Sequence, residues 1–100
     1  MSEGLGISGA KSMLNIAAAT LVSSATVSSY SQRRLARVSV LVAGSTAGSV
    51  NDVASIAAAA ASNQVFVIPN AVGVYAIDFP ILSGIVVTPG TGQTVAVSYD

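Results

Sequence analysis

The sequence predicts an all-β fold, a small antiparallel β-sandwich or barrel with an extended N-terminal arm. Short apolar stretches recur at intervals of about ten residues, which is the spacing of strands in such folds. Each stretch is bounded by Gly, Pro or Asn, the residues that favour turns. A chain of 100 residues has room for one core. We therefore expect one flexible arm, residues 1–13, and one β-sandwich domain, residues 14–100.

The arm is rich in Gly and Ser, and its apolar residues Leu5 and Ile7 are isolated from one another. Such a segment cannot build a core of its own, so it is either disordered or ordered against a neighbouring subunit. In the second case we expect Leu5, Ile7 and Lys11 to contact that neighbour.

Two strands are expected before residue 43. The first lies between Leu14 and Val22, where residues alternate as in a strand, although the alanines there also suit a helix. The second lies in RLARVSVLVAGS, which has the period of two that a half-buried strand requires. One face of this second strand carries Val38, Val40 and Val42, and the other carries Arg37, Ser39 and Leu41.

The middle of the chain contains a turn, AGSTAGS, and then an ambiguous segment, SVNDVASIAAAAASN. Asn51 or Asp52 could cap a short helix over residues 57–61, since alanine has the highest helix propensity. This run has almost no amphipathic stripe, however, and so short a helix is marginal in water. We therefore prefer a short strand near Val50 followed by a loop.

The second half contains four apolar segments that read as strands: NQVFVIP, AVGVYAIDFP, SGIVVTP and QTVAVSY. The first two are expected to stop at Pro69 and Pro80, because proline cannot donate to a strand ladder. Several short strands of this kind are typical of an antiparallel sandwich or barrel.

The last two of these segments are joined by TPGTGQ, which has the turn chemistry of a hairpin. Pro89 fixes its own φ, and Gly90 or Gly92 can take a positive φ. We therefore expect Ile85–Thr88 to fold back and pair with Thr94–Tyr99.

The composition points to association. Hydrophobic residues make up 52% of the chain and charged residues only 8%, against about 25% charged in an average soluble domain. The formal net charge is zero, and neutral, weakly charged surfaces promote association. We expect much of the surface to be covered by copies of the chain or by a partner, although Ser, Thr, Gly and Asn could also hydrate a monomer.

Little in the sequence can carry out chemistry. There is no His and no Cys, so a serine nucleophile lacks its usual base and thiolate metal sites are excluded. The four carboxylates are scattered along the chain, which gives no close pair for acid–base catalysis or calcium. The turn at Gly44–Ser49 lacks the Gly-Lys-Ser/Thr ending of a phosphate-binding loop. We expect no enzyme activity, no cofactor or metal and no small-molecule substrate.

The basic cluster QRRLAR contains Arg33, Arg34 and Arg37. The chain as a whole is neutral and no aromatic residues lie between these arginines, so we expect no nucleic-acid binding. Arginine is enriched at protein interfaces, whereas a solvated strand entry would need no partner. We treat the three arginines as candidate partner contacts.

No segment predicts a membrane anchor or a signal peptide. The longest apolar stretch, AVGVYAIDFPILSGIVV, is interrupted by Asp78, Pro80 and Gly84, and a bilayer span needs about 18 or more apolar residues. The start MSEGLGISGAKSML has no basic residues followed by an apolar block. We expect no membrane contact and no export.

Several motifs follow one another in the order found in small structural proteins of tailed bacteriophages. They are a strand ending in VLV, a Gly-rich turn, VND, an IP stop, VGVY, a P…GIVV strand and a terminal PGTGQ…VSY. Over about residues 35–100 the chain resembles that group. Residues 1–34 are not covered.

The resemblance implies a β-sandwich virion component, a capsid decoration or cement protein that binds the outside of the major capsid shell. It implies the major capsid protein and copies of the chain itself, as a trimer, as partners. It also implies synthesis in the host cytoplasm and a final place on the capsid surface. It suggests no catalytic or metal-binding residues.

Two alternatives remain open. A tail or neck component that recognises host glycans would use the same sandwich with an exposed aromatic and carboxylate site. A fibre subunit of the pilin type would need a donor strand, for which Leu14–Val22 is the candidate.

Overall fold

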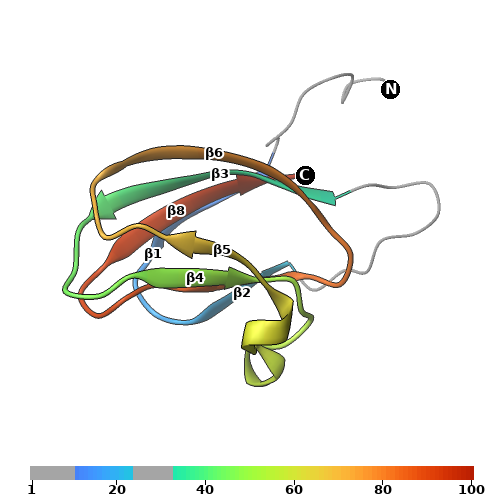
Figure 1. The fold of residues 1–100 in the computed structure, drawn as a ribbon. Helices are drawn as coiled ribbons and strands as arrows, with labels where there is room; N and C mark the ends of the chain where they lie inside the picture. The colour runs from blue at the N-terminus through green and yellow to red at the C-terminus, as the bar shows by residue number, and fades with distance from the viewer. Residues whose placement is uncertain (1–10, 24–32) are drawn as a thin grey trace.

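The computed structural model describes residues 11–23 and 33–100 and contains two four-stranded antiparallel sheets that pack face to face (Figure 1). Sheet A contains, in spatial order, β1 (Lys11–Ile16), β8 (Thr94–Tyr99), β3 (Arg33–Val42) and β6 (Gly73–Ile81). Sheet B contains β2 (Thr20–Ser23), β7 (Ile85–Thr88), β4 (Gly48–Asn51) and β5 (Gln64–Ile68). The predicted all-β sandwich is confirmed.

The order of the strands is that of a jelly roll. Strand β1 pairs with β8, β2 with β7, β3 with β6 and β4 with β5, so the chain is a long antiparallel ribbon rolled up from its two ends. Further pairings, β3 with β8 and β4 with β7, join the turns of this ribbon into the two sheets. Eight strands in two sheets with this nested order define the jelly roll among antiparallel folds.

The jelly-roll order corrects two sequence predictions. The segment from Leu14 to Val22 is two strands, β1 and β2, because the chain crosses from sheet A to sheet B at residues 17–19. The expected hairpin between Ile85–Thr88 and Thr94–Tyr99 is wrong, because β7 pairs with β2 and β4 whereas β8 pairs with β1 and β3. The turn at residues 89–93 crosses between the sheets instead.

Other elements match the expectations except at their ends. The short strand near Val50 is β4, and the loop after it contains two 3₁₀ turns, η1 (Ile56–Ala58) and η2 (Ala61–Asn63), in place of the alternative helix. Strand β1 begins at Lys11, so the last three residues expected in the arm form part of sheet A. Strand β6 continues through Pro80, which an edge strand tolerates because its free side needs no N–H donor.

The core lies between the sheets and is made of aliphatic side chains from both. Alternation along each strand turns every second side chain inward. The buried cluster consists of Ile16, Val22, Leu35, Val38, Val40, Val50, Ile68, Ile81, Ile85, Val87, Val95 and Val97. Burying a side chain of this kind stabilises the fold by about 1.5 to 3 kcal/mol. This core is the main source of stability available to a chain without disulfides.

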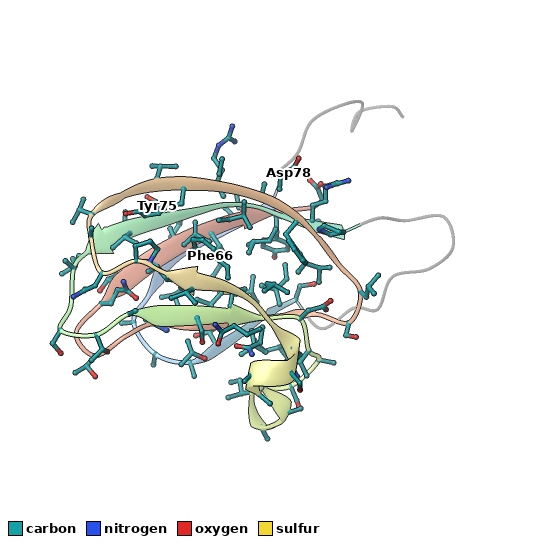
Figure 2. The ribbon with its side chains drawn as sticks, in the orientation of Figure 1. Phe66, Tyr75 and Asp78 are labelled. Atoms are coloured by element: carbon teal, nitrogen blue, oxygen red, sulfur yellow. The ribbon has the colours of Figure 1, made fainter. Side chains whose placement is uncertain are left out.

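Two aromatic rings pack across the gap between the edge strands β5 and β6. The ring centroids of Phe66 and Tyr75 lie 6.4 Å apart at an interplanar angle of 48° (Figure 2). The Tyr75 hydroxyl donates a hydrogen bond to the Ala71 carbonyl at 3.0 Å, so its polar end is satisfied at the rim of the core. The pair closes this side of the sandwich.

Polar side chains join loops at both ends of the sandwich. The side chain of Gln93 accepts a hydrogen bond from the Gly90 N–H at 2.9 Å and donates to the Pro69 carbonyl at 3.0 Å. At the opposite end, the Asp52 carboxylate accepts hydrogen bonds from the N–H groups of Leu82, Ser83 and Gly84. Both side chains therefore fix loops that no strand ladder holds.

The alanine-rich loop is tied over the outer face of sheet B. Asn51 is buried, and its Nδ2 donates to the Ala60 carbonyl and to Asn63 Oδ1, both at 2.8 Å. Asn63 in turn donates to the Ala58 carbonyl at 3.0 Å. These bonds hold in place a segment whose composition alone suggested a helix.

Candidate functional site

The outer face of sheet A carries an apolar groove. In the strand register Ser39 lies opposite Ala96 on one side and opposite Val74 on the other. Small side chains therefore occupy the centre of the sheet, while larger ones, Leu14 of β1 and Val74 of β6, stand at its two edges. Leu14 is 70% exposed and Val74 is 65% exposed. The result is a groove that runs along the strands between two apolar walls.

The groove has a volume of about 210 Å³. It is lined by Ser12, Leu14, Arg37, Ser39, Val74, Ala96, Val97 and Ser98. Leu41, the next outward residue of β3 after Ser39, is also exposed and extends the apolar surface. Arg37 is the single charged residue in this lining. A surface of this composition suits an apolar peptide that carries one acidic group.

The arginines of β3 reach the same outer face because of a β-bulge. Leu35 and Val38 are both fully buried, although regular alternation would turn residues three positions apart to opposite faces. Between Leu35 and Arg37, β3 has one residue more than the facing part of β8, and this bulge absorbs the extra residue. As a consequence Arg34 and Arg37 both point outward.

The two outward arginines differ in their surroundings. Arg34 Nη1 donates to the Asp78 carbonyl oxygen at 3.2 Å and to Asp78 Oδ1 at 3.4 Å. Arg37 has no hydrogen bond or ion pair with any other residue in the described ranges. It lines both the groove and a neighbouring depression of about 290 Å³ that Asp78 also borders. Among the residues that line the groove, Arg37 is thus the cation available to a ligand.

A second apolar surface lies at the end of the sandwich where Asp52 joins the β4–β5 loop to the β6–β7 turn. We call it the loop-end surface, and it consists of the exposed apolar side chains on the segments that Asp52 joins, namely Ile56 of η1, Phe79 of β6 and Leu82 after β6. Leu82 is 67% exposed. Figure 1 shows the loop with η1 and η2 projecting beyond the sheets at this end. The loop-end surface therefore includes a projecting loop, which carries Ile56, whereas the surface on sheet A is a hollow.

The residues predicted to contact a partner lie in different parts of the structure, and two of them lie outside the described residues. Leu5 and Ile7 lie outside the described residues, and Arg33 is placed only as the first residue of β3, opposite Ile81. Lys11 is exposed at the start of β1. Arg34 and Arg37 come together on the outer face of sheet A.

The groove itself was missed by sequence reasoning. Its walls, Leu14 and Val74, are apolar residues at strand edges, and its floor is made of Ser and Ala at positions that look unremarkable in the sequence. A signal does exist, since Ser39, Ala96 and Ser98 are small residues at outward positions of neighbouring strands. These small residues can be recognised as the floor of one groove only when the register between β3 and β8 is known.

The part of the chain that the structure describes contains no group of three His, Cys, Asp or Glu residues that could hold a metal ion. Within the same residues, no helix has the length and apolar character needed to cross a membrane. What the surface offers is contact area, chiefly apolar, with one free cation at the groove.

The fold and these surfaces define a jelly-roll domain that exposes apolar side chains on one sheet face and at one end. No protein-family model, no curated protein and no solved structure matches the chain.

Proposed function

We propose that the protein is a structural component of a bacteriophage virion, a capsid decoration or cement protein that binds the outer surface of the major capsid shell and stabilises it. The order of motifs over residues 35–100 supports this proposal. The jelly-roll order supports it by analogy, since viral capsid domains are frequent among jelly rolls. Partners in this proposal are the major capsid protein and further copies of the chain, arranged as a trimer.

The observation that carries the proposal is the loop-end surface on a chain with so few charges. Exposed apolar surface of this kind marks contact sites between proteins. Apolar side chains on a projecting loop could insert into a seam between shell subunits, because such a seam is concave. Each side chain removed from water there contributes up to about 1.5 to 3 kcal/mol, and multivalent attachment multiplies weak contacts into firm binding.

Shell binding through faces rather than sheet edges follows from the strand ladders. All four edge strands, β1, β2, β5 and β6, contain a register shift. A bulged edge presents an irregular row of N–H and C=O groups, which hinders the addition of another strand. Apolar burial is thus the mechanism that the proposal assigns to attachment.

The test measures binding of the purified chain to phage shells that lack it, by co-sedimentation. A double variant, Ile56→Ser with Leu82→Ser, removes apolar area from the loop-end surface. We expect it to bind at least about tenfold more weakly, which corresponds to a loss of about 1.4 kcal/mol. The matched control is Val67→Thr, an exposed position on β5 of sheet B, which should bind like the unchanged protein. Shells that never retain the unchanged chain would refute the proposal.

A second candidate function, a tail or neck component that recognises glycans, is favoured by one local feature. Phe79 is partly exposed next to the exposed carboxylate of Asp78, and sugar sites combine an aromatic face with acidic hydrogen-bond acceptors. Binding of the purified chain in a glycan screen, lost in Phe79→Ala, would support this function over the first. Imaging of intact particles separates the two by the position of the added density.

A further inference from the structure

The groove on sheet A has polar and apolar positions at regular intervals along β3. Arg37, Ser39 and Leu41 are successive outward residues of this strand. Arg37 and Ser39 lie about 7 Å apart along it, and Leu41 follows at the register shift between Val40 and Val42. Arg37 provides a free cation, Ser39 lies on the floor between Leu14 and Val74, and Leu41 continues the apolar surface. Along the strand, a positive charge at Arg37 is therefore followed by a hollow at Ser39 and then by an apolar side chain at Leu41.

The first ten residues of the chain have a matching order. In SEGLGIS, Glu3, Leu5 and Ile7 alternate with Gly4 and Gly6. An extended segment presents alternate residues on one face at intervals of about 7 Å. One acidic and two apolar side chains would therefore face the same way, with glycines behind them. Glu3 is also the only charged side chain among residues 1–10 and 24–32.

We propose that residues 3–7 of one copy bind the groove of a second copy, with Glu3 on Arg37, Leu5 over Ser39 and Ile7 beside Leu41. The carboxylate of Glu3 provides the acidic partner that Arg37 lacks among the described residues. Leu5 enters the hollow between the two apolar walls. The glycines leave the outer side of the bound segment free of bulk, so the segment can lie flat along the strands.

Chain length decides that the occupant comes from a second copy. Lys11 lies opposite Tyr99, and Tyr99 lies opposite Leu35, so Lys11 is level with Leu35 in the sheet. Val40 lies opposite Val95, four residues from Tyr99 in β8, so Leu41, one residue beyond, is more than about 14 Å from that level, and β8 lies between β1 and β3. The four residue steps from Ile7 to Lys11 span at most about 14 Å, so a chain cannot place Ile7 beside its own Leu41. If residues 3–7 instead lay in their own groove in the opposite direction, with Ile7 near Arg37, Glu3 would lie near Leu41 and far from Arg37.

This contact is of the arm-to-groove type, in which different surfaces of the two copies meet. Such heterologous contacts close into a ring when the rotation between copies permits and otherwise continue as a chain. The inference goes beyond the shell proposal and does not depend on it, because it concerns copies of the protein in solution.

A charge exchange tests the inference with the purified full chain in sedimentation experiments over a range of concentrations. Glu3→Arg and Arg37→Glu should each weaken self-association by about tenfold. The combined variant carries the same two charges in exchanged positions and should recover most of the lost association. Leu5→Ser with Ile7→Ser should weaken association at least as much. Val67→Thr, an exposed position on β5 of sheet B and outside the groove lining, is the control and should leave association unchanged.

Three outcomes would overturn the inference. The unchanged chain could be monomeric at every concentration, association could persist in both single variants, or the combined variant could remain as weak as the singles. Circular dichroism of each variant checks that the fold is intact. Because no shell is present, failure here leaves the shell proposal standing, and failure of shell binding leaves this inference standing.

Discussion

At the scale of single residues, the buried polar side chains show why a loop-rich end can be as well ordered as a sheet. Gln93 is 1% exposed, and its amide joins two different connections, the turn at Gly90 and the chain at Pro69. Next to it, Gly44 has no room for a side chain, because a Cβ there would overlap the Thr91 carbonyl oxygen. The loops at this end therefore meet backbone to backbone.

We predict that Gln93→Ala lowers the free energy of unfolding by about 1 to 3 kcal/mol, because it leaves the partly buried Gly90 N–H and Pro69 carbonyl without partners. Urea denaturation measures the change. Gln64→Ala is the control, since Gln64 is exposed, and it should change stability by no more than about 0.5 kcal/mol. Equal stability of the two variants would show that water replaces the Gln93 contacts.

At the scale of strands, both edges of sheet A are interrupted by a residue in the left-handed conformation. Asn15 in β1 has φ of 56° and Asp78 in β6 has φ of 48°, and each lies at a register shift. Asn and Asp tolerate this conformation better than other residues with a Cβ. The two bulges turn the edges of the sheet away from regular pairing.

For Asp78, backbone conformation and ion pairing can be separated by two substitutions. Asp78→Asn keeps the tolerance for positive φ and removes the charge, and should cost no more than about 1 kcal/mol because the pair with Arg34 is exposed. Asp78→Val removes both the charge and the tolerance for positive φ. It should lower the free energy of unfolding by a further 1 to 2 kcal/mol or so, because a β-branched residue is strained at positive φ. Chemical denaturation of both variants compares these costs. A smaller loss for valine than for asparagine would contradict the assignment.

The strands also show what could be predicted from sequence. Alternation located β3 and its buried residues Val38 and Val40, and turn chemistry located the break after Thr88. The pairing of β7 and β8 was predicted wrongly, because a Gly-rich turn of this kind can serve either a hairpin or a crossing between sheets. The choice is made by distant strands, β2 and β4 on one side and β1 and β3 on the other.

The candidate site was predictable only in part, for the same reason. The cluster of arginines was visible, but the bulge that brings Arg34 and Arg37 to one face depends on the partner strand β8. The hollow between Leu14 and Val74 depends on strands that are far apart in sequence. Features made by one strand can be inferred from its pattern, whereas features made by the register of several strands cannot.

At the scale of the whole molecule, the protein combines a firm core with a surface that carries few charges. The core contains only aliphatic side chains, and the sequence has no histidine. Histidine is the side chain whose ordinary pKa, about 6.5, lies nearest to neutrality. The protein therefore has no histidine side chain whose protonation would change its stability or assembly on mild acidification.

We accordingly predict that the free energy of unfolding stays constant to within about 0.5 kcal/mol between roughly pH 6 and pH 8, because equal proton uptake by folded and unfolded chains gives a flat profile. Thermal and urea denaturation at several pH values check this prediction. Introducing a histidine at a buried position, as in Val97→His, should produce a profile in which stability falls with decreasing pH. A steep profile in the unchanged protein would contradict the prediction.

The nested pairing of the strands sets the order in which the molecule can be completed. Strand β8 comes last of the eight in sequence order, yet it lies between β1 and β3 and hydrogen-bonds to both. While the polypeptide emerges from the ribosome, β1 therefore has no neighbour in its sheet until about 80 further residues have been synthesised. Such delayed closure exposes unpaired edges to other nascent chains, so completion of sheet A depends on an intact β8.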